Sequence, residues 1–86
     1  MNMHISGVLV RAYPQHLETV SQALSGLQGV EVHGANPDGR IVVTVEQENE
    51  GSMSDLLVQM QDVPGVLSAS MIYHQFEESG QQEAEQ

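Results

Sequence analysis

The chain has 86 residues, 40% of them hydrophobic, which suits one domain with a modest core. Twelve acidic residues outweigh two basic ones, Arg11 and Arg40, and the formal net charge is −10. This balance argues against nucleic-acid and anionic-lipid binding, because phosphate contacts need clustered Lys and Arg, and it favours a basic partner. Without cysteine, the chain has no disulfide, thiolate nucleophile or cysteine-based metal site.

Residues 1–6 lack the basic and apolar pattern of a secretory signal. The chain also has no run of about 18 apolar residues, which a membrane-spanning helix would need. We therefore expect a cytoplasmic protein that does not bind membranes.

The first third of the chain predicts a strand, a helix and a short strand. Residues 4–12 (HISGVLVRA) are aliphatic and too short for a helix, so they predict a strand. Pro14 suits the first turn of a helix, and Gly29 stands where a left-handed residue would end it. The apolar residues at helical spacing between them are Leu17, Val20, Leu24 and Leu27. Residues 30–33 then alternate as a strand.

The rest of the chain predicts a hairpin, a second helix and a last strand. Residues 36–39 (NPDG) are a turn signal, and residues 40–46 (RIVVTVE) are the clearest strand. Residues 52–55 (SMSD) resemble a capping box, and Pro64-Gly65 ends the helix that follows. Its apolar residues are Met53, Leu56, Leu57, Met60 and Val63. Residues 66–76 predict a long strand.

Residues 77–86 (EESGQQEAEQ) are polar and acidic. We expect them to form a disordered tail, and we expect the folded domain to comprise residues 1–76.

An internal repeat supports the fold. At an offset of 36 residues, the apolar positions of the first helix fall on those of the second, and Gly29-Val30 falls on Gly65-Val66. Two βαβ units with both helices on one face predict an α+β, ferredoxin-like βαββαβ sandwich. Its four-stranded antiparallel sheet has the order 4-1-3-2.

Two helices cover only one face of this sheet and leave an open face. Alternation places Ile41, Val43 and Val45 under the helices. The residues expected outward are Glu31, His33, Arg40, Val42, Thr44 and Glu46. For the first strand, the repeat favours Ile5 and Leu9 inward. We prefer the opposite phase, with Leu9 and Arg11 outward, because burying Arg11 in so small a core is costly.

The last strand has apolar residues in both phases. Leu67, Ala69, Met71 and Tyr73 alternate with Val66, Ser68, Ser70, Ile72 and His74. In either phase the open face carries apolar side chains between acidic ones, as interaction sites do. Uncovered sheets of small domains also keep aliphatic residues, or dimerise through them, without another partner.

Signals for catalysis or metal binding are weak. The four histidines, His4, His16, His33 and His74, have no metal-ligand spacing, so we predict no metal site. No glycine-rich loop joins a strand to a helix. Arg11 and Asn36 suit an acyl-phosphate clamp, but Pro14 removes an N–H from the loop that such a site needs. We predict neither an enzyme nor a cofactor.

Several short segments, taken in order, form a recognisable pattern: residues 4–6 (HIS) with 8–10 (VLV), then 29–33 (GVEVH), 39–46 (GRIVVTVE) and 65–69 (GVLSA), with Tyr73-His74. In this pattern the chain resembles the NapD family, the small cytoplasmic chaperones of the periplasmic nitrate reductase. The likeness extends over residues 4–78. It implies a protein that binds the twin-arginine signal peptide of the catalytic subunit and delays export until the molybdenum cofactor is inserted.

A basic, apolar signal peptide suits an acidic protein with an apolar sheet face. We expect the peptide to lie across the sheet as an amphipathic helix, bound by a monomer. The strand phases, rather than the resemblance, select the candidate binding residues. For apolar contact they are Leu9, Val42, Thr44 and Met71, and for the peptide arginines they are Glu31 and Glu46.

Two alternatives remain open at this point. One is a regulatory module that binds small molecules and dimerises through the open face, and the other is a structural subunit that uses this face as an obligate interface. Sedimentation separates them from a monomeric peptide binder.

Overall fold

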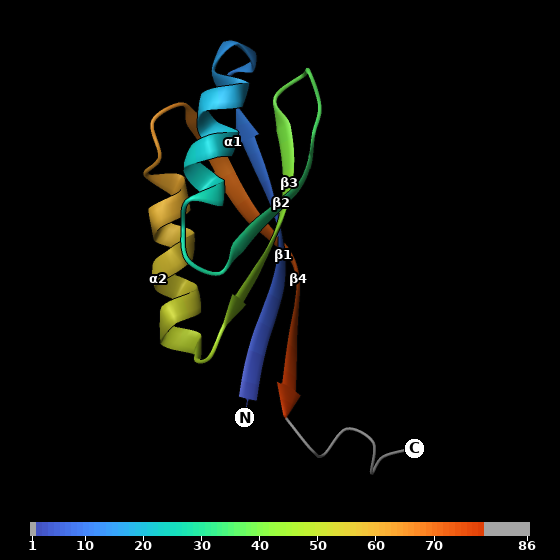
Figure 1. Cartoon of the computed structure of the whole chain (residues 1–86), viewed down its shortest axis with the longest axis vertical. Helices are drawn as coiled ribbons and strands as arrows, with labels where there is room; N and C mark the ends of the chain where they lie inside the picture. Colours follow the sequence, from blue (N-terminus) through green and yellow to red (C-terminus); the bar gives the residue numbers. More distant parts are fainter. Residues whose placement is uncertain (1, 79–86) are drawn as a thin grey trace.

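The computed structural model describes the backbone of residues 2–78 and the side chains of residues 3–75. The elements are β1 (Asn2–Ala12), the short 3-10 helix η1 (Pro14–His16), α1 (Leu17–Ser25), β2 (Val30–Ala35), β3 (Arg40–Gln47), α2 (Glu50–Gln61) and β4 (Val66–Glu78). All neighbouring strands are antiparallel, in the order β2-β3-β1-β4. This is the predicted order read from the other edge. Both helices lie on one side of the sheet and leave the other side uncovered (Figure 1), which confirms the predicted fold.

The core lies between the sheet and the two helices. Val8 and Val10 of β1 pair with Val43 and Ile41 of β3, and all four side chains are completely buried. The helices contribute the residues Val20, Leu24, Met53, Leu56 and Met60. The other predicted apolar positions, Leu17, Leu27, Leu57 and Val63, pack around this core and are partly buried. The predicted apolar faces are confirmed within the two helices, whereas Leu27 and Val63 lie in the turns that follow α1 and α2.

The inward phase of β1 agrees with the preferred prediction. Ser6, Val8 and Val10 are completely buried, whereas Arg11 is exposed. The repeat offset alone gives the wrong phase for this strand. Keeping the guanidinium in water avoids the cost of an unpaired charge in a small core.

Two predicted helix ends are each wrong by three residues, since the C-cap of α1 is Gly26 and the N-cap of α2 is Asn49. The helix α1 ends at Ser25, and Gly29, with φ of 85°, lies in the turn before β2. There the Gly29 carbonyl accepts a hydrogen bond of 2.9 Å from the Glu46 N–H. The helix α2 begins at Glu50, because the Asn49 side chain caps it and accepts from the Ser52 N–H at 2.7 Å.

The last strand continues to Glu78, two residues beyond the predicted end. The remainder of the predicted tail, residues 79–86, lies outside the described residues. Neither helix of the described part is long and apolar enough to cross a membrane.

Candidate functional site

The open face carries the side chains that alternate with the buried ones along β1 and β3. Directly opposed residues share a face, so the register of the two strands defines it. From one end to the other, the opposed pairs on this face are Arg11 and Arg40, Leu9 and Val42, Gly7 and Thr44, and Ile5 and Glu46. The face is therefore basic at one end, apolar in the middle and acidic at the other end.

The basic end of the open face holds both arginines of the chain. Arg40 is paired with Asp38, whose carboxylate lies 2.9 Å from its Nε. Arg11 has no ion pair with any residue of the described part. Asp38 belongs to the predicted 36–39 turn, which the hydrogen bond from the Gly39 N–H to the Asn36 carbonyl closes at 2.9 Å.

The acidic end combines two carboxylates from neighbouring strands. Glu31 of β2 is opposite Thr44, one pleat from Glu46 on the same face. A hollow of about 300 Å³ is lined by Gly29, Val30, Glu31, Thr44 and Glu46. His33 stands beside it, with Nε2 at 2.7 Å from Thr44 Oγ1 and 4.0 Å from Glu31 Oε1. Both carboxylates therefore face one open recess.

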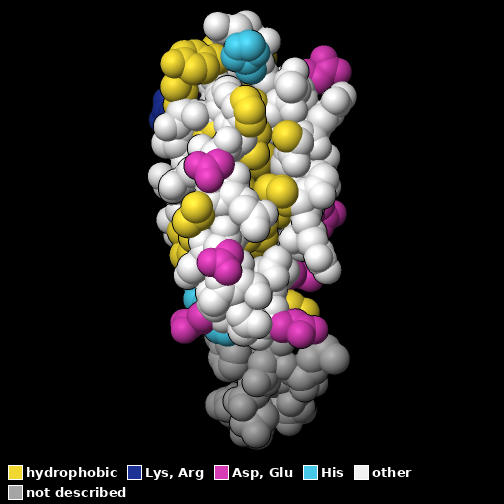
Figure 2. Space-filling model, turned by 90° about the vertical axis from the view of Figure 1, so that its left-hand side faces the viewer, with side chains coloured by type: hydrophobic (Ala, Val, Ile, Leu, Met, Phe, Trp, Pro, Cys, Tyr) yellow, Lys and Arg dark blue, Asp and Glu magenta, His cyan; other side chains and the backbone are white. Residues whose placement is uncertain are grey.

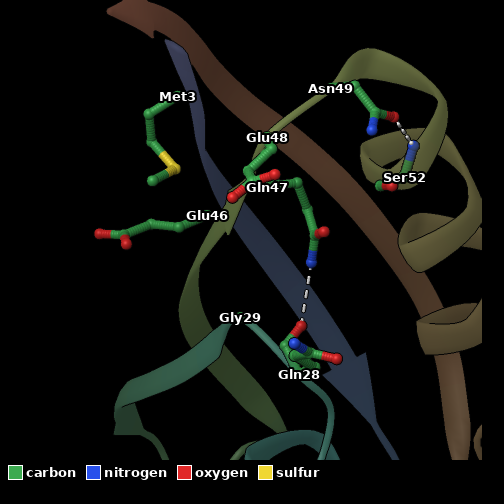
Figure 3. Close-up of a pocket in the computed structure, with 8 residues that line it drawn as sticks. All are labelled: Met3, Gln28, Gly29, Glu46, Gln47, Glu48, Asn49 and Ser52. Carbon is green, nitrogen blue, oxygen red and sulfur yellow. Dashed lines mark hydrogen bonds between the residues drawn. The ribbon is translucent and has the colours of Figure 1, made fainter. Parts of the chain in front are cut away.

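A second and larger recess adjoins the first at the end of β3. It has a volume of about 570 Å³ and is lined by Met3, Gln28, Gly29, Glu46, Gln47, Glu48, Asn49 and Ser52. In Figure 3, Glu46 and Met3 project away from Gln47, which turns to the opposite side and donates a 3.0 Å hydrogen bond to the Gln28 carbonyl. Glu46 thus borders both recesses.

Five of the six predicted site residues lie on the open face. Val42 is 44% exposed and Leu9 is partly buried beside it. Glu31, Thr44 and Glu46 form the acidic end just described.

The placement of Met71 on the open face is wrong. Met71 pairs with Val8, which is buried under the helices, and it lines a recess together with Glu50 and Met53 of α2. The cause is irregular pairing along β4, where Leu67 and Ile72 are extra residues without a partner in β1. Each extra residue reverses the alternation that follows it.

Tyr73 lies on the open face and was absent from the predicted site. It pairs with Gly7, and its side chain is 47% exposed. Its ring covers Gly7, which is buried although it lies on this face. The predicted alternation places Tyr73 and Met71 on the same side of the sheet. In the structure the extra residue Ile72 lies between them, so their side chains lie on opposite sides.

Comparison with known proteins gives the same fold and one family. A sequence model described as NapD protein matches residues 3–78. The proteins named Chaperone NapD from Escherichia coli strain K12 and from Shigella flexneri are each 30% identical over 82 residues, which are 94% of this chain and 94% of theirs. The solution structure of the E. coli Tat proofreading chaperone NapD superposes with a TM-score of 0.79 at 30% identity, covering 93% of this chain and 85% of that one.

A more distant structure, a transcriptional regulatory protein of the ASNC family from Pyrococcus furiosus, shares the fold alone. Its TM-score is 0.61 at 15% identity, over 91% of this chain and 55% of that one. The close relatives, in contrast, are named as chaperones, in agreement with the prediction that the chain is not an enzyme. On the family match and the full-length relatives, the chain belongs to the NapD family.

Proposed function

We propose that the protein is a cytoplasmic chaperone that binds the twin-arginine signal peptide of the periplasmic nitrate reductase catalytic subunit on its open face. By holding this peptide, it delays export until the molybdenum cofactor is inserted. The description of the solved relative as a Tat proofreading chaperone supports this proposal.

The observation that carries the proposal is the shared recess of Glu31 and Glu46. A guanidinium group forms charge-assisted, often bidentate hydrogen bonds with carboxylates. One arginine of the peptide enters this recess. The next enters the adjoining recess, where Glu46 and Glu48 supply carboxylates.

The apolar middle of the open face receives the hydrophobic part of the peptide. Leu9 and Val42 are directly opposed at its centre, and the Tyr73 ring lies beside them over Gly7. An amphipathic helix laid on an apolar surface uses residues one turn apart for such contacts. Thr44 separates the apolar centre from the acidic end.

The separation of charge along the open face sets the direction of the peptide. Arg11, which has no ion pair within the described residues, repels a basic segment, whereas Glu31 and Glu46 attract it. The arginine end of the peptide therefore lies at the Glu46 end of the sheet. The hydrophobic segment then extends towards Arg11.

The binding species is a monomer, because a dimer through the open face would cover the same residues. The net charge of −10 also opposes association of two copies. Sedimentation equilibrium of the free protein tests this directly, and a tight dimer would contradict it.

The proposed function is tested by calorimetric titration with a synthetic twin-arginine signal peptide. We expect a saturable one-to-one isotherm that weakens with salt, since the attraction between exposed charges is screened. The double variant Glu31→Gln with Glu46→Gln removes both carboxylates with little change in shape, and we expect about tenfold weaker binding.

The matched control is Glu18→Gln, which removes an exposed carboxylate from α1 on the helix-covered side. We expect it to bind as the unmodified chain does. No binding by the unmodified chain, or equal losses in the control and the double variant, would overturn the proposed site.

A further inference from the structure

We propose that His4, Glu50 and His74 form a zinc-binding site on the side of the sheet that faces the helices. The three residues come from β1, α2 and β4, and one ligand atom of each lies within 4.8 Å of the others. Imidazole nitrogen and carboxylate oxygen are ligands that zinc takes in proteins. The site is on the opposite side of the sheet from the proposed peptide-binding face and does not depend on the proposed function.

The two histidines already stand at the separation that a shared metal requires. His4 Nδ1 lies 3.1 Å from His74 Nε2, and the ring centroids are 5.1 Å apart. With zinc–nitrogen bonds of 2.0–2.1 Å and tetrahedral angles, two ligand nitrogens are separated by about 3.3 Å. A zinc ion thus replaces the direct contact between the rings with almost no movement of the strands.

Ser6 holds His74 in the orientation that this site needs. Its Oγ is completely buried and lies 2.8 Å from His74 Nδ1. When this ring nitrogen donates its hydrogen to Ser6, the lone pair of Nε2 points towards His4. A hydrogen-bond partner on the second nitrogen is typical of histidines that bind metals, since it fixes the tautomer and the ring.

Glu50 completes the set from a separate element. It occupies the first turn of α2, which the Asn49 side chain fixes by capping the Ser52 N–H. His4 and His74 lie on the paired strands β1 and β4, and Glu50 lies at the capped start of α2. The backbone therefore holds all three residues in place without a metal. Sites assembled on helices and strands are more precise than sites on loops.

The three ligands found among the described residues leave a fourth position for water or another ligand. A recess of about 430 Å³, lined by Glu50, Met53, Ser54, Met71 and His74, opens at this position. Figure 2 shows histidine and acidic side chains near the lower end of the helix-covered side, and of the three proposed ligands Glu50 and His74 are exposed. Two imidazoles favour zinc over magnesium or calcium, which take oxygen ligands.

The test is titration of the full chain, without any histidine tag, with zinc chloride by calorimetry. Absorption of bound Co²⁺, whose visible bands report a tetrahedral nitrogen and oxygen environment, is a second readout. We expect one ion per chain and a thermal unfolding midpoint that rises with zinc. His4→Gln and His74→Gln should each weaken binding at least tenfold, since loss of even a hydrogen-bond partner of a metal ligand costs about 10- to 100-fold in metal affinity.

His16→Gln and His33→Gln are the matched controls, since both residues lie outside the cluster and should leave zinc binding unchanged. If His74→Gln does not fold, Glu50→Gln at an exposed helix position takes its place. Absence of zinc binding, or equal losses in cluster and control variants, overturns the site. Signal-peptide binding by His4→Gln should equal that of the unmodified chain, so that the two proposals fail separately.

Discussion

The ring of Tyr73 lies over Gly7, its partner across the β1–β4 ladder. A Cβ atom at position 7 would overlap Cε2, Cδ2 and Cζ of this ring. Glycine in the middle of a strand costs conformational entropy, and an aromatic side chain across the ladder covers the exposed backbone that it leaves. The pair therefore supplies a flat aromatic surface on the open face.

Replacing Gly7 by alanine should displace the Tyr73 ring and lower the free energy of unfolding by about 1 kcal/mol. In a Tyr73→Ala background the same replacement should cost nothing, because the clash is gone and alanine suits a strand better than glycine. Urea unfolding of the four proteins in a double-mutant cycle measures this coupling. An identical cost in both backgrounds would show that the ring does not determine the residue at position 7.

Reversing the charge of Glu46 should weaken signal-peptide binding more than neutralising it, because Glu46→Lys converts attraction into repulsion at the border of both recesses. The side chain is exposed, so the free energy of unfolding should change by less than about 0.5 kcal/mol. Calorimetry and urea unfolding test the two statements. Glu18→Lys is the control, and unaltered affinity of Glu46→Lys would exclude this residue from the site.

The proposed direction of the peptide predicts which resonances a paramagnetic label will broaden. A nitroxide at the arginine end of the peptide should broaden the amide signals of Gly29 and Glu46. A nitroxide at the far end of its hydrophobic segment should broaden those of Arg11 and Arg40. The reversed pattern would contradict the argument from charge separation.

Gly39→Ala should be far more destabilising than Gly34→Ala. Gly39 has φ of 102°, and a Cβ there would overlap the Ala12 carbonyl oxygen, whereas one at Gly34 would meet no atom within 4 Å. We expect a loss of about 1–3 kcal/mol for Gly39→Ala, from backbone strain, and less than about 0.5 kcal/mol for Gly34→Ala. Thermal and urea unfolding compare them, and similar stabilities would refute the assigned turn.

The helices and the central strands follow from the sequence because each has one dominant period. Val20 and Leu24 lie one turn apart, and the buried Val43 stands between the exposed Val42 and the half-buried Thr44, so packing and periodicity agree. The charge of Arg11 selects the phase of β1 for a similar reason. The start of α2 is different, because Asn49 and Ser52 are both good caps and only the three-dimensional path of the loop selects between them.

The last strand was less predictable because its apolar residues occupy both phases. Leu67 and Ile72 carry no sequence mark that distinguishes an extra residue from a paired one. The misplaced Met71 follows from this, because the extra residue Ile72 separates it from Tyr73. The contact between His4 and His74, which are 70 positions apart, depends on the register that sets His74 opposite Ser6, and the alternation within the strand does not give this register.

The two extra residues of β4 also affect how the molecule behaves at high concentration. This 13-residue strand forms one border of the sheet, and its outer backbone groups have no partner strand within the described residues. The exposed edge of a long, regular strand can pair with the same strand of another copy, and this pairing begins edge-to-edge aggregation. The register shifts at Leu67 and Ile72 divide this edge into short stretches and so oppose such pairing. A chain lacking both residues would keep the same side chains on each side of the sheet, but it would lose this protection against aggregation.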